Sequence, residues 1–367
     1  MLEVADIVRL HGAAYRQQFG DRLTATQKRA LRDILHCRTP FFGGHVYTCA
    51  PCGRDVYAYH SCGNRHCPKC HRDQTERWLA RHRSRLLPCP YYLLTFTLPA
   101  PLRPLARSHP RIVYSLLLRS AAQSLLKLAR DPRYLGGRPA CLAILHTWTR
   151  AMLYHPHVHM LVSAGGLGPD GHWIPPRSRG FFVPVRSLSP IFRARMCDGL
   201  NRAGLLDQAR SEVWHTDWVV HCQPAGSGEA VLAYLGRYLF RVAIANSRIE
   251  RVDDDQVSFR YRDNRSRQIR HVTLSGTEFL HRFLQHALPR GFARIRSYGL
   301  WSPACRPHLE RLQSQLSLRS APTAPSNAPE SAAAQPVPDH TLLRCPYCRN
   351  TTLILRGHIA PQRTRAP

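Results

Sequence analysis

The chain has 367 residues, and its 52 Lys and Arg residues against 23 Asp and Glu residues give a net charge of +29. This excess comes mostly from arginine and is spread over the whole chain. It therefore favours nucleic acid as the partner over a membrane surface, which usually attracts a basic tail or an amphipathic helix. The sequence has no apolar run of about eighteen residues and no basic and apolar leader, so we expect no membrane-spanning helix and a cytoplasmic location.

The first part of the chain is predicted to contain helices on either side of a cysteine-rich segment. Residues 1–36 carry apolar side chains at three- to four-residue spacing, which predicts helix. Residues 37–72 hold six of the 13 cysteines together with several histidines. Residues 73–87 are predicted to form a basic helix, and Pro88 and Pro90 mark a boundary after it.

The centre of the chain mixes predicted strands and helices. Aromatic and β-branched residues predict a strand over residues 91–98, and a leucine-rich helix is expected at about 110–130. The later predicted elements are strands at 140–147, 158–163 and 213–222, a helix at 229–243, a hairpin over 257–274 that turns at Asp263-Asn264, and a helix at 278–288. This mixture predicts an α+β domain.

The C-terminal part begins with a segment of low complexity. Residues 320–338 are rich in Ala, Pro and Ser without periodicity, which predicts a flexible linker. A short tail follows and contains the C-x2-C pair Cys345 and Cys348. Two cysteines do not close a tetrahedral metal site, so this pair would need His340, His358 or a contribution from another region of the chain.

Two further C-x2-C pairs lie in the cysteine-rich segment. Cys49 with Cys52 and Cys67 with Cys70 are separated by fourteen residues. Four thiolates at this spacing can surround one zinc ion tetrahedrally, and we predict that these four cysteines hold a structural Zn²⁺. The alternative of buried free thiols or a redox pair leaves two such pairs within 22 residues unexplained.

A second zinc site is predicted from the remaining side chains of the segment. Its expected ligands are two cysteines and two histidines, namely Cys37, His45, Cys62 and His66. His60 and His71 compete for the same role, and the alternative is that these histidines contact DNA or solvent. Zinc would supply folding free energy that a segment with few apolar residues otherwise lacks.

Two histidines lie at the start of the predicted strand at 158–163. His157 directly precedes the strand and His159 is its second residue. Residues two apart on a strand point the same way, so both imidazoles can bind one divalent ion while Val158 packs into the core. Two imidazoles leave positions for a phosphate, and oxygen-donor substrates favour Mg²⁺ or Mn²⁺. A third ligand is left open between His155 and His146. The alternative is an incidental pair of core or surface histidines.

Two tyrosines, Tyr234 and Tyr238, lie four residues apart in the predicted helix at 229–243 and share one of its faces. A tyrosine hydroxyl can attack a DNA phosphate and retain the bond energy in a covalent intermediate. Gly236 lowers helix stability by up to about 1 kcal/mol relative to alanine, which the close approach of DNA or of another element would explain. The alternative is that both tyrosines pack into the core.

Five basic residues are predicted to bind DNA, with further arginines at 77–85. They are Arg65, Lys69, Arg72, Arg237 and Arg241. The first three lie in or beside the cysteine-rich segment, and the last two lie beside the tyrosines. Contacts to phosphates position a protein on DNA without reading its sequence.

Several motifs occur in one order along the chain. They are Cys37-Arg38-Thr39 with Gly43-Gly44-His45; Cys49-x2-Cys52-Gly53; Ser61-Cys62-Gly63-Asn64-Arg65-His66-Cys67-Pro68-Lys69-Cys70; Leu145-His146-Thr147-Trp148; His155-Pro156-His157-Val158-His159; Tyr234-Leu235-Gly236-Arg237-Tyr238; and Gly291-Phe292-Ala293-Arg294-Ile295-Arg296-Ser297-Tyr298-Gly299. In these segments, roughly residues 25–305, the chain resembles the two-tyrosine HUH transposases of rolling-circle insertion sequences, the insertion sequence 91 type.

The resemblance implies a division of the chain. Residues 1–87 would form a zinc-binding DNA-recognition domain and residues 88–318 a ferredoxin-like, antiparallel-sheet HUH nuclease domain. Residues 319–340 would be a linker and residues 341–367 a tail. It also implies an enzyme of the bacterial nucleoid that cleaves and rejoins single-stranded DNA at transposon ends through a 5′-phosphotyrosine intermediate.

When the roles of the family's motif residues are transferred to the matching positions, the resemblance implies that His157 and His159 are metal ligands. It implies in the same way that Tyr234 and Tyr238 are nucleophiles. DNA is the expected partner, with no membrane and no small-molecule substrate. A plasmid replication initiator or relaxase would share this chemistry, but the paired C-x2-C motifs favour the transposase. A zinc protein that only binds DNA is the non-catalytic alternative.

Overall fold

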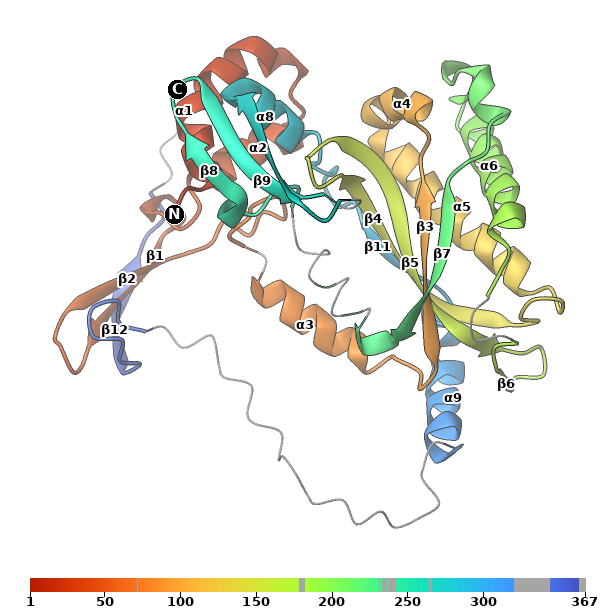
Figure 1. The fold of residues 1–367 in the computed structure, drawn as a ribbon. Coiled ribbons are helices and arrows are strands. Elements are labelled where there is room, and N and C mark those ends of the chain that lie inside the picture. Colours follow the sequence, from red (N-terminus) through yellow and green to blue (C-terminus); the bar gives the residue numbers. More distant parts are fainter. Residues whose placement is uncertain are drawn as a thin grey trace.

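The computed structural model describes residues 1–70, 72–177, 182–230, 232, 236, 242–263, 266–319 and 344–362, with the backbone alone for residues 72–77 and 317–319. The described part combines α-helices with antiparallel sheets (Figure 1), which confirms the predicted α+β class. No helix in these ranges is long and apolar enough to cross a membrane.

The largest sheet has the strand order β11-β4-β5-β3-β7, and β6 pairs with β5. Its strands are β3 (Pro90–Thr97), β4 (Arg138–Trp148), β5 (Tyr154–Leu167), β6 (Trp173–Ile174), β7 (Val220–Ser227) and β11 (Ile295–Gly299). The strands predicted at 91–98, 140–147 and 158–163 are confirmed, and β5 is longer than predicted at both ends.

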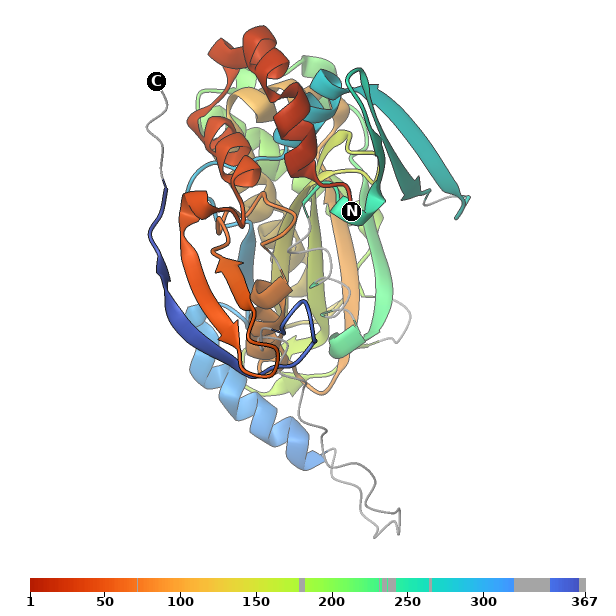
Figure 2. The same cartoon turned by 90° about the vertical axis from the view of Figure 1, so that its left-hand side faces the viewer.

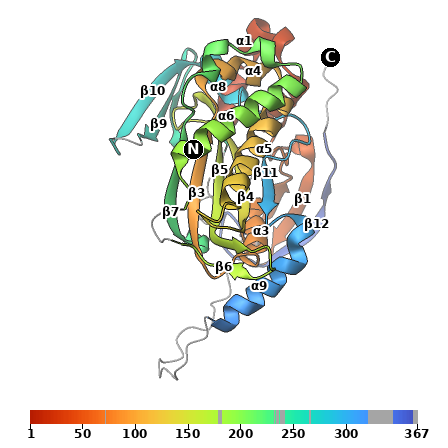
Figure 3. The same ribbon diagram turned by 90° about the vertical axis from the view of Figure 1, so that its right-hand side faces the viewer.

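Successive side chains along each strand point to opposite faces of this sheet, and the two faces have different neighbours. Val158 and Met160 of β5 are fully buried in the core on one side of the sheet. Figure 3 shows the helices that cover this side. Those helices are α4 (Arg103–Ser108), α5 (Pro110–Ala129) and α6 (Val185–Arg202). Leu161 packs on the opposite face, in a core that also receives α3 (Arg72–Arg83) and α9 (Arg306–Arg319). His157 and His159 belong to this second face.

A second core joins the N-terminal helices to a later part of the chain. It contains α1 (Val4–Phe19), α2 (Ala25–Leu35) and α8 (Gly276–Leu284), packed on a sheet of β8 (Ile249–Val252), β9 (Gln256–Arg262) and β10 (Ile269–Ser275). A Cβ on Gly276 would lie 2.0 Å from the ring of His11, so glycine lets α1 and α8 approach closely. β9 and β10 confirm the predicted hairpin, although Asn264 of its turn lies outside the described residues.

A third sheet, in the order β12-β1-β2, joins the cysteine-rich segment to the C-terminal tail. Its strands are β1 (Gly44–Cys49), β2 (Asp55–Tyr59) and β12 (Leu353–Ile359). Figure 2 shows β12 running along the outer edge of β1. The sequence did not predict this pairing, because two short strands without strict alternation give little periodic signal.

The strand predicted at 213–222 begins only at Val220, and residues 211–214 form a short 3-10 helix instead. Val213 and Trp218 in this stretch are buried against the side of the sheet that α6 covers. The helix α6 was not predicted. The strand was predicted to begin too early because β-branched and aromatic residues are typical of strands, and here they are buried without forming one.

Candidate active site and metal centres

Three histidines converge on the open face of the largest sheet. His146 of β4 is paired in register with His157 of β5, and His159 lies two residues further along the same face. The ligand nitrogens of the three rings all lie within 4.8 Å of one another, and the Nε2 atoms of His157 and His159 are 3.2 Å apart. Two neighbouring strands therefore bring the three imidazoles to one point.

Hydrogen bonds orient two of these rings. His157 Nδ1 donates to the backbone oxygen of His155 at 2.7 Å, and His159 Nδ1 is bonded to Thr95 Oγ1 on β3 at 3.1 Å. Because Nδ1 of His157 carries the proton, its Nε2 keeps a lone pair that faces the partner histidine. Outer hydrogen bonds of this kind are what hold a metal-binding imidazole in place.

Burial keeps the three histidines neutral. It lowers the pKa of His157 to about 3 and that of His159 to about 4, and His159 contributes further to the shift at His157. The pKa of His146 is also well below its ordinary value, first because the ring is buried and then because a proton on it would be repelled by Arg294 and by any proton on His157 or His159. Neutral imidazole is the form that binds a metal, so the three rings fit a divalent ion.

The third member of the cluster is His146 rather than His155. His146 belongs to the group of converging ligand atoms, whereas His155 Nδ1 accepts a hydrogen bond from Arg103 at 2.8 Å. The sequence left these two residues as alternatives. Only the β4–β5 register decides between them.

The histidines line a cavity of about 530 Å³. Arg150, Arg248 and Arg262 also line it, and its described walls include no Asp or Glu. Cationic walls of this kind favour an anionic ligand, and guanidinium groups match the geometry of phosphate.

The predicted nucleophiles Tyr234 and Tyr238 lie outside the described residues, as do Arg237 and Arg241. Gly236 between them is described and buried. A Cβ there would lie 2.7 Å from Cδ2 of Leu79 on α3. The close approach of another element, which was one predicted reason for a glycine here, is therefore confirmed.

The first of two cysteine clusters lies between α2 and α3. Cys37, Cys62, Cys67 and Cys70 have their sulfurs within 4.8 Å of one another, and Cys70 Sγ is 3.5 Å from both Cys37 Sγ and Cys62 Sγ. Sulfurs bound tetrahedrally to zinc at about 2.3 Å are about 3.8 Å apart, so this set fits a structural zinc ion.

The second cluster combines the β1–β2 turn with the C-terminal tail. Cys49 Sγ lies 3.4 Å from Cys348 Sγ, and Cys52 Sγ lies 3.6 Å from Cys345 Sγ. All four sulfurs are within 4.8 Å of one another, which again fits a four-cysteine zinc site. Cys49 and Cys345 are fully buried.

The structure corrects the predicted grouping of the cysteines. The pairs Cys49–Cys52 and Cys67–Cys70, predicted to share one zinc, belong to different clusters. The reason is the path of the chain. β1 carries Cys49 about 16 Å away from Gly44, while β2 returns the chain toward Cys62 and Cys37.

The predicted histidine ligands of the second site also lie elsewhere. His45 Nε2 is 3.0 Å from His60 Nε2, and the ring of His45 packs edge-on against that of His358 on β12. His66 Nε2 is bonded to the backbone oxygen of Phe283 at 2.9 Å. Four-cysteine sets therefore replace the predicted cysteine-histidine set.

Two protein families match the chain. The family described as "Transposase zinc-binding domain" matches residues 7–98, and the family described as "Putative transposase" matches residues 141–308. The first range contains all of the first cysteine cluster, which is Cys37, Cys62, Cys67 and Cys70. The second range contains the three histidines. Cys345 and Cys348 lie outside both matches.

Named relatives agree with these matches. "Putative transposase y4qJ" of Sinorhizobium fredii (strain NBRC 101917 / NGR234) is 38% identical over 376 residues, covering 96% of this chain and 94% of the relative. "Transposase for insertion sequence element IS801" of Pseudomonas savastanoi pv. phaseolicola is 30% identical over 322 residues, covering 80% and 76%. The chain belongs to the insertion sequence 91 family of transposases. No solved structure matches it.

The basic residues of the transposase zinc-binding region have different surroundings. Arg65 donates to the backbone oxygens of Leu288, Pro289 and Phe292, and Lys69 forms an ion pair with Glu3. The side chain of Arg72 lies outside the described residues. In this structure Arg65 and Lys69 thus tie the cysteine-rich segment to neighbouring elements.

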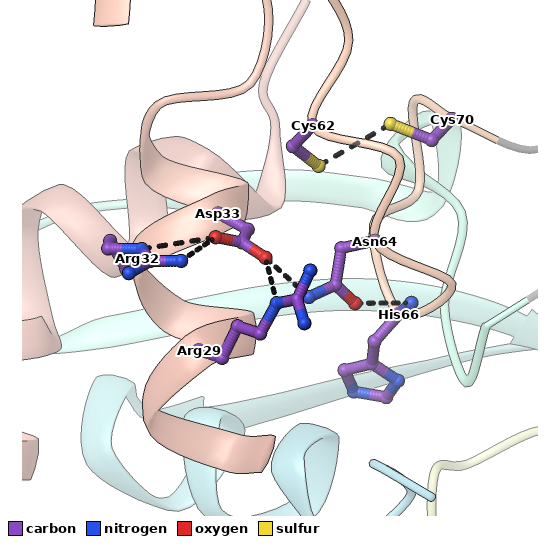
Figure 4. A network of polar contacts seen from close by, with 7 residues as sticks. All are labelled: Arg29, Arg32, Asp33, Cys62, Asn64, His66 and Cys70. Atoms are coloured by element: carbon purple, nitrogen blue, oxygen red, sulfur yellow. Dashed lines mark hydrogen bonds and ion pairs between the residues drawn. The ribbon is translucent and has the colours of Figure 1, made fainter. Parts of the chain in front are cut away.

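A buried carboxylate anchors the same segment of the transposase to α2. The Asp33 side chain is only 2% exposed. It accepts hydrogen bonds from Arg29, Arg32 and the Asn64 side chain (Figure 4). Asn64 Oδ1 in turn accepts from the backbone N–H of His66 at 2.9 Å. Asp33 therefore holds the loop that carries Cys62 and Cys67.

Replacing Asp33 with Ala is expected to lower the free energy of unfolding by roughly 3 kcal/mol, because Asn64 and two arginines lose a buried acceptor. Urea denaturation followed by circular dichroism measures this loss. The control is Asp198→Ala, since Asp198 is 65% exposed and lies 3.9 Å from Arg202. Equal effects of the two substitutions would contradict a stabilising role for Asp33.

Proposed function

We propose that this transposase cleaves and rejoins single-stranded DNA at the ends of its element through a 5′-phosphotyrosine intermediate, as rolling-circle transposition requires. The observation that supports this most is the cluster of His146, His157 and His159 in a cavity with arginine walls. A site that gathers neutral ligand nitrogens and positive charge suits a phosphodiester.

The proposed reaction uses a tyrosine as nucleophile. The hydroxyl oxygen of Tyr234 or Tyr238 forms a bond to the phosphorus, and the bond from phosphorus to the 3′-oxygen breaks. The leaving strand takes up a proton as a free 3′-hydroxyl, and the tyrosine proton passes to solvent or a nearby base. Rejoining reverses the step with a different 3′-hydroxyl, so no energy cofactor is needed.

The three histidines would hold the catalytic ion and orient the scissile phosphate. A bound Mg²⁺ or Mn²⁺ would neutralise charge on the non-bridging oxygens of that phosphate. Thr95 and the His155 carbonyl keep His159 and His157 in position. Arg150, Arg248 and Arg262 add positive charge around the same cavity.

Covalent trapping tests this proposal. The protein is incubated with Mn²⁺ and single-stranded DNA from both flanks of its gene, using each strand in turn, and is then denatured in detergent. We expect a DNA–protein band that requires metal and disappears in the Tyr234→Phe/Tyr238→Phe double variant. Tyr57→Phe is the matched control, because Tyr57 is exposed on β2. An undiminished band in the double variant would overturn the nucleophile assignment.

A further inference from the structure

A second cavity, of about 430 Å³, adjoins the histidine cavity. We call it the Arg294 pocket, after one of its lining residues. The two cavities share Trp148 and Val242 in their walls. Trp148 follows His146 by two residues on β4, and its indole stacks on the His146 ring with centroids 5.3 Å apart. The proposed metal site and the Arg294 pocket are therefore separated by a single side-chain layer.

The Arg294 pocket has a strong excess of positive charge. Arg29, Arg65, Arg290 and Arg294 line it, and its described lining includes no Asp or Glu. Asp33 pairs with Arg29, but no carboxylate in the described part of the chain pairs with the other three. Burial, with the charge of Arg65 adding to it, lowers the pKa of Arg294 to about 10. The guanidinium of Arg294 is therefore half-buried beside another positive charge, and no carboxylate in the described residues pairs with it.

The loop that forms one wall of the pocket is held in place by two arginines. Arg65 donates to the backbone oxygens of Leu288, Pro289 and Phe292, and Arg111 donates to that of Arg290 at 2.5 Å. Gly291 has a φ of +72°, which lets the loop turn there. These bonds join the side chains of Arg65 and Arg111 to backbone oxygens of the loop. They do not use the side chains of Arg290 and Arg294, which remain for a ligand.

Arg294 is linked to the histidine cluster through the backbone. Its carbonyl accepts the N–H of Leu145 at 2.8 Å, and Leu145 directly precedes His146. A ligand bound at Arg294 therefore has a fixed relation to the three histidines.

We propose that the Arg294 pocket binds a second phosphodiester of the single-stranded DNA, next to the phosphate at the histidine cluster, with Arg294 and Arg290 as its ligands. This inference rests on the proposed function. The strand would run from the histidine cavity past Trp148, and contact with two of its phosphates would fix the register in which it is cut.

The test measures coupling between one arginine and one phosphate. Affinities for single-stranded DNA of the element's ends are measured by fluorescence anisotropy in the Tyr234→Phe/Tyr238→Phe background, so that no strand is cut. A series of oligonucleotides carries one neutral methylphosphonate at each position in turn. Apart from the scissile phosphate at the histidine cluster, we expect one further position at which the methylphosphonate weakens binding about tenfold. Arg294→Gln should cause the same loss with unmodified DNA and no further loss with that methylphosphonate.

Controls separate this result from a loss of folding or of overall charge. Arg202→Gln removes an equal charge from an exposed side chain at the end of α6 and should keep the methylphosphonate effect. Arg294→Lys should restore part of the affinity. If Arg294→Gln unfolds, Arg290→Gln, at an exposed position, gives the same test. If the loss of affinity caused by Arg294→Gln multiplies with the loss caused by the methylphosphonate at every position of the oligonucleotide, the assignment of the pocket is wrong.

The trapping assay distinguishes the two proposals. An adduct formed by the protein with native tyrosines, without coupling between Arg294 and any phosphate, would overturn the pocket and leave the phosphotyrosine chemistry in place. Coupling without an adduct would overturn that chemistry and support the phosphate site.

Discussion

Replacing His146 with Ala is expected to lower the rate of DNA–protein adduct formation about a thousandfold, the equivalent of about 4 kcal/mol in the barrier. The reason is geometric. His146 contributes the third nitrogen to the cluster, and a two-histidine site would bind the catalytic ion weakly and leave the phosphate poorly oriented. The measurement is the single-turnover rate with saturating DNA over a range of Mn²⁺ concentrations.

Comparison variants make this result specific. His157→Ala and His159→Ala should have similar effects, whereas His155→Ala should have a smaller one, because His155 contacts Arg103. The exposed His215 is the matched control, and His215→Ala should leave the rate unchanged. A normal rate in His146→Ala together with a lost rate in His155→Ala would exchange the roles of these two residues.

The Cys345→Ser/Cys348→Ser double variant is expected to lower the zinc content from two ions per chain to one. The tail supplies half of the ligands in its cluster, and a pair of cysteines alone does not close a tetrahedral site. Binding of a structural zinc is worth roughly 10–16 kcal/mol in small zinc modules, so β1 and β2 should lose most of their protection from hydrogen exchange. Elemental analysis and hydrogen-exchange mass spectrometry measure the two effects.

The grouping of the cysteines gives this experiment its controls. Cys49→Ser should remove the same ion as the tail variant, so combining them should cause no further loss of zinc. Cys67→Ser should remove the other ion. Cys197→Ser and Cys222→Ser change half-buried cysteines outside both clusters and should retain two ions. Two ions in the tail variant would contradict the four-cysteine assignment.

The sequence by itself determined the local features of this protein. His157 and His159 lie on one face because side chains on a strand alternate, and this holds wherever the strand lies in the fold. The C-x2-C motifs place two thiolates together for a similar local reason. The order of these motifs along the chain was sufficient to indicate the transposase family, which the relatives then confirmed.

The tertiary structure decided which local features meet. His146 joins His157 only through the register of β4 and β5. Cys52 meets Cys345 across 293 residues because β12 pairs with β1, and no pattern in either segment specifies that partner. Spacing in sequence reports distance along the chain, whereas ligand sets depend on distance in space. For residues far apart in sequence, packing of the elements between them determines that distance.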